Sequence, residues 1–212
     1  MTVVIDLQNE ALNQNSDVLS LLRKALLIAR KLKLTEFESW INNELNGYKN
    51  GNSIPDYREI RGVLQAYNPY HGWIPVVLHD NKLENQLCCK RIPDSIPSIQ
   101  NLMISSNNEC VIEMPAGINS LLNENAPFAT KYRLRVPMNA ISNIVEQVKN
   151  KILDWSLVLE ENGILGEKLL FTEEEKNIAQ STPQIINYIS NFYGDVSDSQ
   201  IQQGTKNSKQ RQ

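Results

Sequence analysis

The strongest pattern in the chain begins after Ser16, where apolar residues return at the three- and four-residue spacing of one helix face. The residues on this face are Val18, Leu21, Leu22, Ala25, Ile28, Ala29 and Leu32. A second helical face follows with Phe37, Trp40, Ile41 and Leu45. Thr35 and Glu38 predict a capping box at its start, and Gly47 predicts its end because glycine adopts the left-handed conformation of a helix terminus. Because the connection is short, the two helices are expected to form an antiparallel hairpin.

Beyond this hairpin, short segments of alternating character predict a sheet with helices between its strands. Residues 57–67 favour a strand in which Gly62 marks a bulge or a close backbone approach. Residues 68–81 are typical of a loop followed by a short extended piece. Further extended segments are expected at residues 87–92, 110–114 and 131–136, and short helices at residues 97–104 and 118–123.

The longest helical pattern covers about residues 138–162, and Gly163 is its expected stop. Its apolar face contains Ile141, Ile144, Val145, Val148, Ile152, Trp155 and Leu159. This helix is expected to close the core begun by the hairpin. The predicted fold class is therefore α+β, with an N-terminal helical hairpin and a long C-terminal helix packed on a small mixed sheet.

The character of the sequence changes past Gly166. Thr172 with the acids after it predicts the N-terminus of one more short helix. The last residues are polar and contain few large apolar side chains. The expected organisation is an α+β domain at residues 1–166, a short helix or connector at 167–180, and an Asn- and Gln-rich polar tail at 181–212.

Composition narrows the possible partners and compartments. Hydrophobic residues make up 41% of the 212 residues, enough for one main domain with its own core. A net charge of -3 gives no general attraction to phosphate backbones, so nucleic acid is not expected as a partner. No apolar run approaches the roughly 20 residues of a membrane span, and the N-terminus is acidic where a signal peptide is basic. We therefore expect a cytoplasmic protein that does not contact membranes.

The sequence contains no recognisable catalytic motif. His71 and His79 lack the third ligand of a metal site, and the three cysteines fit neither a disulfide framework nor a zinc knuckle, which favours reduced structural thiols. There is no nucleophile motif, phosphate-binding loop or dinucleotide fingerprint. Glu113 and Asp154 lie among apolar residues, where burial raises a carboxyl pKa, but the pattern favours a surface or Arg-paired carboxylate. No catalytic residue, metal or cofactor is predicted.

One stretch, Trp40 to Gly62, combines aromatic, Asn, Gly, Pro and Arg residues densely. One interpretation is an aromatic, charge-bearing pocket for a ligand or peptide, formed around the glycine-rich turn by Trp40, Glu44, Tyr48, Tyr57 and Arg58. The other is a structural corner, in which Glu44 or Asp56 pairs with Arg58 and Pro55 fixes the start of the strand.

Three segments of this region form a specific pattern: L-L-R-K-A-L-L-I-A-R-K-L at residues 21–32, W-I-N-N-E-L-N-G-Y at 40–48 and I-P-D-Y-R-E-I-R-G at 54–62. With them the chain resembles the bacterial AbiTii family, named for abortive infection. The resemblance is strongest over residues 5–62 and continues more weakly to about residue 162. It implies a role in defence against phage as a recognition or regulatory module, and it transfers no catalytic residue.

The tail contains an I-Q-x-G core and resembles, more loosely, short amyloid-forming signalling motifs of the RHIM-like kind. Such segments assemble by sharing backbone bonds and Gln or Asn ladders between chains. The candidate assembly residues are Phe192, Tyr193, Val196, Gln200, Ile201, Gln202 and Gln203. A flexible polar linker and strand addition to one neighbouring subunit are the alternatives.

Together these patterns favour a non-catalytic binding module of antiphage defence. It is expected to act through a partner protein of the defence system or through homo-oligomerisation. The alternative is an effector enzyme, a nuclease or a nucleotide-processing enzyme, whose active site is dispersed along the sequence and includes His71 or His79.

Overall fold

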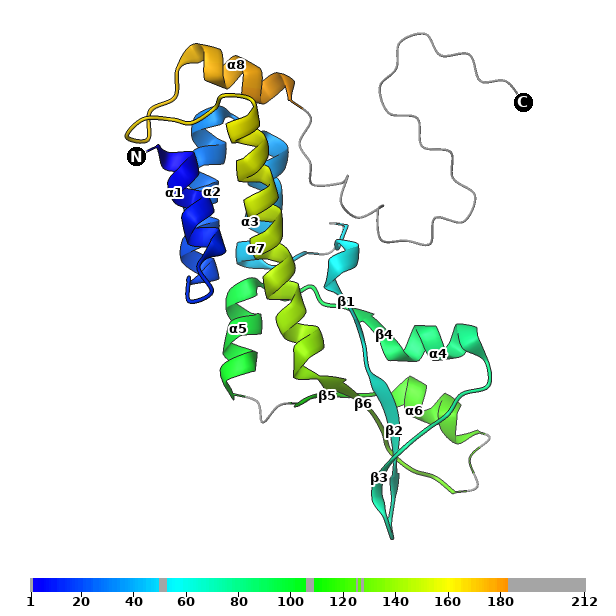
Figure 1. Cartoon of the computed structure of the whole chain (residues 1–212). Helices are drawn as coiled ribbons and strands as arrows, with labels where there is room; N and C mark the ends of the chain where they lie inside the picture. The colour runs from blue at the N-terminus through cyan, green and yellow to red at the C-terminus, as the bar shows by residue number, and fades with distance from the viewer. Residues whose placement is uncertain (1, 50–52, 106–108, 125, 127, 183–212) are drawn as a thin grey trace, which may run out of the picture.

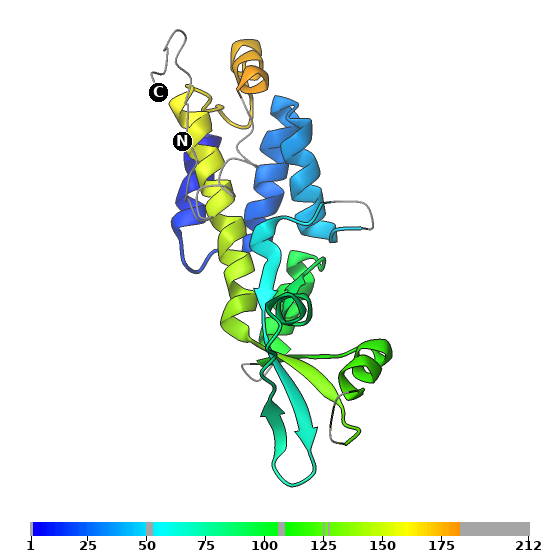
Figure 2. The same cartoon turned by 90° about the vertical axis from the view of Figure 1, so that its right-hand side faces the viewer.

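The computed structural model describes residues 2–49, 53–105, 109–124, 126 and 128–182, and it shows an elongated molecule with helices at one end and a sheet at the other (Figure 1). The helical end contains α1 (Val3–Leu12), α2 (Val18–Leu32), α3 (Thr35–Asn46), α7 (Met138–Glu161) and α8 (Glu173–Ser181). Helix α7 runs from the sheet to the far end of the helices, as the second view also shows (Figure 2). The predicted α+β class is confirmed.

The helices pack as the apolar stripes predict. Helices α2 and α3 form the expected hairpin, and α7 closes its core together with α1. Leu21, Ile28 and Leu32 of α2 are fully buried there. The rings of Phe37 on α3 and Trp155 on α7 stack with their centroids 3.9 Å apart, which joins the hairpin to the long helix. The predicted short helix after Thr172 is also confirmed, with a complete capping box between Thr172 and Glu175.

Two features of the helical end differ from the expectation. Helix α1 was not predicted, because its pattern is short and one of its buried positions is Gln8, whose amide donates to the Ser156 carbonyl oxygen at 3.2 Å. The capping box at Thr35 was wrong, since Thr35 is already the first helical residue. Lys33 takes a left-handed conformation, with φ 60°, that ends α2 and brings the chain directly into α3. Glu38 instead pairs with Arg30 of α2 at 2.8 Å.

The sheet end contains a four-stranded sheet in the order β3-β2-β6-β5, formed by β2 (Val63–Asn68), β3 (Gly72–Pro75), β5 (Glu109–Glu113) and β6 (Tyr132–Pro137). A separate pair joins β1 (Glu59–Arg61) to β4 (Cys89–Arg91). All of these described pairs are antiparallel, where a mixed sheet was expected. Neighbouring strands β2 and β3 follow one another through a tight turn, whereas a parallel pair needs a long crossover.

Gly62 divides the strand that was predicted as one piece. A Cβ at this position would lie 2.6 Å from Cγ of Leu134 and 2.9 Å from the Arg135 carbonyl oxygen, so the predicted close approach is confirmed. The chain passes here from the β1–β4 pair into the larger sheet. The first residues of the predicted strand form a 3-10 turn instead, η1 (Asp56–Arg58).

The short helices of the sheet end are α4 (Asn81–Cys88), α5 (Ile96–Ser105) and α6 (Ala116–Asn123), of which α5 and α6 were predicted. Helix α4 was not, because its residues fell between a predicted loop and a predicted extended segment. Its start is fixed by Asp80, whose carboxylate accepts the Lys82 backbone N–H at 2.8 Å. The α2–α3 hairpin packs mainly on helices, where a sheet was expected, and α7 is the long helix that also contacts β6 and β1.

No helix in the described part of the chain is both long enough and apolar enough to cross a membrane. All the candidate assembly residues, from Phe192 to Gln203, lie outside the described residues. The prediction of assembly through the tail therefore stays a prediction.

Candidate functional site

A buried polar cluster lies where the helical end meets the sheet end, and it brings together the five residues predicted for the pocket: Trp40, Glu44, Tyr48, Tyr57 and Arg58. Glu44 lies on the same buried stripe of α3 as Phe37, Trp40 and Ile41, because it follows them at helical spacing. This position directs its side chain into the cluster. Glu44 and Arg58 are each 0% exposed. A carboxylate and a guanidinium buried this completely require each other, because an unpaired charge in such surroundings is very costly.

Arg58 donates four hydrogen bonds in the cluster. Its Nη2 donates to Oε2 of Glu44 at 2.5 Å and its Nε to Oε1 at 3.2 Å, which is a bidentate pair. Its Nη1 donates to the carbonyl oxygens of Ile92 at 3.0 Å and Asp94 at 2.7 Å. One guanidinium thus joins α3 to the segment between β4 and α5. The expected pairing of Arg58 with Glu44 is confirmed, whereas Asp56 pairs with Arg91 at 2.7 Å.

Two tyrosines and a tryptophan complete the network around the carboxylate. Gly47, with φ 84°, ends α3 and lets the next backbone N–H, of Tyr48, donate to the Pro93 carbonyl oxygen at 2.8 Å. The Tyr48 hydroxyl then reaches back to Oε1 of Glu44 at 2.6 Å. The Tyr57 hydroxyl donates to the same oxygen and accepts the Trp40 indole N–H at 2.9 Å. The carboxylate is therefore held from three sides.

Helix α7 adds Lys151, which faces this network, and Asp154, which interacts with Lys151. Lys151 is 8% exposed, and its Nζ lies 5.0 Å from the centroid of the Tyr57 ring. Burial lowers the pKa of Lys151, against the opposing effect of Asp154 and Glu44. Burial raises the pKa of Asp154, as expected from its apolar neighbours, against the opposing effect of Lys151. Lys151 was missed, although it stands on the apolar stripe between Val148 and Trp155.

The protonation states follow from this geometry. Burial, and then the charge of Glu44, raises the pKa of Tyr48 and of Tyr57 far above the ordinary value, so both hydroxyls remain donors. Burial alone would lower the pKa of Arg58, but its hydrogen bonds and charge pairing with Glu44 outweigh this and raise the pKa. The cluster ties α3, η1 and α7 together. The predicted ligand-binding role of its residues stays a prediction.

The other residues singled out from the sequence lie apart from this cluster. His71 stands in the turn between β2 and β3 and His79 just before α4, and both are exposed. In the part of the chain that the structure describes, no three His, Cys, Asp or Glu side chains gather to hold a metal ion. Glu113 is exposed on β5. Cys88 is buried, and all three cysteines are free thiols.

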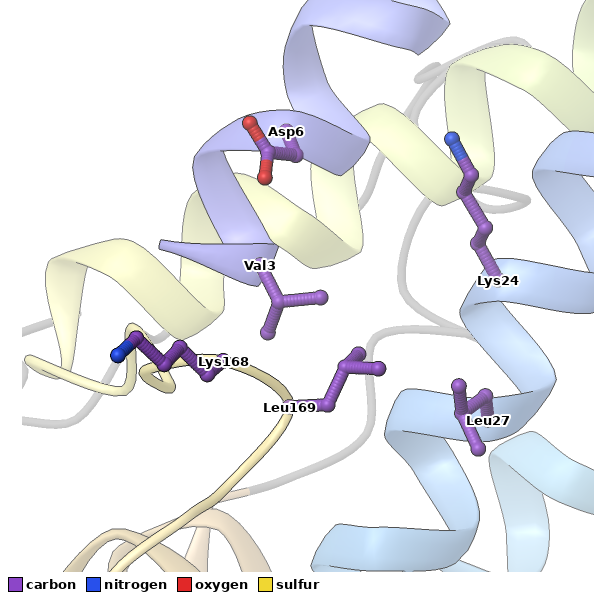
Figure 3. A pocket seen from close by; sticks show the side chains of 6 residues that line it. All are labelled: Val3, Asp6, Lys24, Leu27, Lys168 and Leu169. Atoms are coloured by element: carbon purple, nitrogen blue, oxygen red, sulfur yellow. The ribbon is translucent and has the colours of Figure 1, made fainter. Parts of the chain in front are cut away.

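A second feature was not predicted: an open hollow of about 380 Å³ between α1, α2 and the loop before α8. It is called the leucine groove here and is lined by Val3, Asp6, Lys24, Leu27, Lys168 and Leu169. Figure 3 shows the Leu169 side chain between Val3 of α1 and Leu27 of α2. Leu27 is 41% and Leu169 39% exposed, so the apolar lining of the groove faces solvent.

The loop that contributes Leu169 has an uncommon backbone. Lys168 and Leu169 follow one another with φ 49° and 65°, a left-handed conformation that costs non-glycine residues about 1–2 kcal/mol each. Glu167 and Leu170 hold the turn through paired backbone hydrogen bonds of 3.0 and 2.8 Å. The loop is also fixed to α1, because the Val3 N–H donates to the Gly166 carbonyl oxygen at 3.2 Å. Sequence periodicity misses such a site because the loop has no periodic pattern.

These elements define a class of α+β protein in which a helical bundle is tied to an antiparallel sheet by a buried Glu–Arg pair. The AbiTii family model matches residues 2–184, which include both ends of the molecule and the polar cluster. The chain belongs to the AbiTii family, and the family name points to abortive infection, a defence against phage. The match extends past residue 162, where the sequence resemblance ended. Neither the curated proteins nor the solved structures gave a match.

Proposed function

We propose that the chain serves abortive-infection defence in the cytoplasm as a binding module without a reaction of its own, and that it works by pairing with a second copy through the leucine groove. The observation that carries this proposal is the loop before α8. Its left-handed residues keep Leu169 39% and Leu170 71% exposed, although folding normally buries leucine. Backbone strain that places apolar side chains at a solvent-facing groove is a feature of binding surfaces.

The charges around the groove favour a second copy as the occupant. Asp6 lies on one side of the groove and Lys168 on another (Figure 3). Neither forms an ion pair within the described residues, whereas Lys24 is paired with Glu10. A two-fold interface brings the same surface of both copies together, so a surface with both signs of charge complements itself. Asp6 of one copy then faces Lys168 of the other, around a centre of leucine side chains.

The test compares molar masses by size-exclusion chromatography with light scattering. The full chain is expected to have the mass of a dimer and Leu27→Glu the mass of a monomer, because the new carboxylate would be buried at the interface. Leu121→Glu is the matched control, since Leu121 is 47% exposed and lies on α6 at the sheet end. It should remain dimeric. A monomeric mass for the unaltered chain at all concentrations, or a dimeric Leu27→Glu, refutes the groove as the interface.

A chain ending after residue 182 separates the groove from the tail, whose predicted assembly role is the competing explanation. It keeps the dimeric mass if the groove is the interface and loses it if the tail is. Plaque counts in phage-infected cells that express each variant then connect the oligomeric mass to protection. Leu27→Glu should lose protection while Leu121→Glu retains it. Equal protection by a folded, monomeric Leu27→Glu would rule out pairing as the mode of action.

A further inference from the structure

A second hollow, at the opposite end of the molecule from the leucine groove, is lined by aromatic side chains. It lies between the β2–β3 hairpin and the segment that leads into β6, and its volume is about 340 Å³. It is called the aromatic pocket here, and Tyr67, Pro69, Trp73, Phe128 and Lys131 provide most of its lining. Tyr67 is 45% and Phe128 49% exposed, so these rings present open surface to solvent.

The aromatic side chains are held in place by their neighbours. The rings of Tyr67 and Trp73, which pair across β2 and β3, meet edge to face with centroids 5.4 Å apart. The guanidinium of Arg133 lies 4.1 Å from the Trp73 ring centroid, and its Nε donates to Oε1 of Gln65 at 2.9 Å. Trp73 therefore contacts both Tyr67 and Arg133 where it lines the pocket.

The opposite wall is also fixed. The Thr130 hydroxyl donates to the Tyr67 carbonyl oxygen at 2.5 Å, and the Thr130 N–H donates to Oδ1 of Asn123 at 2.9 Å. The segment that carries Phe128 and Lys131 is therefore joined both to β2 and to α6. A pocket with both walls fixed loses little freedom when a flat ligand enters.

We propose that the aromatic pocket binds a free nucleotide, with the base against Tyr67, Trp73 and Phe128 and the phosphate near Lys131. Base stacking on aromatic side chains contributes about 1–3 kcal/mol per base and does not require base-specific hydrogen bonds. The pocket volume lies at the lower end of the roughly 300–1,000 Å³ of small-molecule sites, which fits one base with its sugar.

The charges around the pocket favour an anionic ligand and a single nucleotide over a longer strand. Lys131 is the one charged residue among the described residues that line the pocket, and the guanidinium of Arg133 lies over the Trp73 ring. Glu113 lies opposite Arg133 in register on the next strand, whereas Glu109 pairs with Arg135 toward the far end of β6. An anionic ligand is thus favoured at Lys131 and a cationic one is not. The net charge of -3 gives no wider attraction to a polyanionic strand, so the pocket is assigned to a single nucleotide.

Tryptophan fluorescence of the full chain offers a direct test. Trp40 and Trp155 are 5% and 3% exposed in the helical end, so a ligand in the aromatic pocket reaches Trp73 and not the other two. Titration with AMP, CMP, GMP or UMP is expected to quench the emission saturably, and Trp73→Phe should remove the response. Inorganic phosphate should not quench, because it provides no ring to stack.

Affinity variants separate the pocket from the surrounding surface. Lys131→Ala and Tyr67→Ala are each expected to weaken binding of the best nucleotide about tenfold, the equivalent of one lost stacking or charge contact. Tyr70→Ala is the matched control, because Tyr70 is an aromatic of the same hairpin turn, 91% exposed and outside the lining. It should bind as the unaltered chain does. Far-UV circular dichroism confirms that each variant is folded.

Three results would overturn the assignment. The first is absence of saturable quenching by all four mononucleotides. The second is unchanged affinity in the folded Lys131→Ala and Tyr67→Ala variants. The third is saturation only by an oligonucleotide or by a proline-rich peptide, which would give the pocket to another class of ligand. None of these outcomes depends on pairing through the leucine groove, so the two proposals fail separately.

Discussion

Replacing Glu44 by Gln removes one charge from the most buried ion pair in the described structure and leaves the side-chain size unchanged. Arg58, 0% exposed, would then have no carboxylate partner. The new amide nitrogen would also stand among donors, because the Glu44 oxygens accept from Arg58, Tyr48 and Tyr57. Both effects act in the same direction and destabilise the folded state.

The magnitude follows from the complete burial of the pair. Breaking a buried pair by removing one partner costs about 3–5 kcal/mol, against a total stability of roughly 5–15 kcal/mol for a domain. For a chain of this size, 1 kcal/mol corresponds to about 2–4 °C in Tm. Glu44→Gln is therefore expected to lower Tm by about 6–20 °C.

The assay is urea unfolding followed by circular dichroism, with the free energy extrapolated to water. Glu38→Gln is the control, because Glu38 stands on the same helix and its partner Arg30 is 58% exposed, so the loss should stay below about 1 kcal/mol. Adding Arg58→Met to Glu44→Gln should recover part of the stability, since the unpaired charge is gone. Equal losses in Glu44→Gln and Glu38→Gln would refute the reasoning.

Two further predictions concern the backbone and the tyrosines. Gly62→Ala places a Cβ 2.6 Å from the Leu134 side chain, so it is expected to lower the free energy of unfolding by about 1–3 kcal/mol in thermal unfolding. Gly117→Ala is the control, because it has open space around it and should raise the free energy of unfolding by up to about 1 kcal/mol. Equal effects of the two substitutions would contradict the close approach at Gly62. The pKa values of Tyr48 and Tyr57 are raised only in the folded state, so the unfolded chain loses these two protons first. The free energy of unfolding is therefore unaffected below about pH 10 and falls above it by about 1.4 kcal/mol per pH unit for each tyrosine. In Tyr57→Phe the free energy of unfolding, measured by urea unfolding at several alkaline pH values, should fall by about 1.4 kcal/mol less per pH unit. An unchanged pH dependence would argue against the raised pKa.

Long apolar stripes made the helical end predictable. Helices α2, α3 and α7 each bury one continuous face, and a helix with such a face has few alternative arrangements. The short helices were harder to predict. Helix α1 buries the polar Gln8 within its apolar stripe, and α4 falls between a predicted loop and a predicted extended segment. Local sequence does not show which distant group satisfies a buried amide.

The candidate site was predictable only in its local part. Glu44, Tyr48, Tyr57 and Arg58 are close in sequence, and Glu44 was one of the two partners expected for Arg58. The carbonyls of Ile92 and Asp94 and the ammonium of Lys151 come from distant segments that carry no motif. The aromatic pocket was missed for the same reason, because Tyr67 and Phe128 meet only after β2 and β6 have paired.

The position of the buried pair has a consequence for the whole molecule. Apolar side chains of similar volume would stabilise this junction at least as well, so stability alone does not account for a buried Glu44 and Arg58. A planar guanidinium that must satisfy one carboxylate and two carbonyl groups at once permits a single arrangement of α3 relative to β4 and η1, whereas apolar surfaces tolerate sliding. The pair therefore fixes how the helical end is oriented on the sheet end. Both proposed binding surfaces lie beyond this junction on opposite sides, so their relative orientation depends on Arg58 keeping its partners.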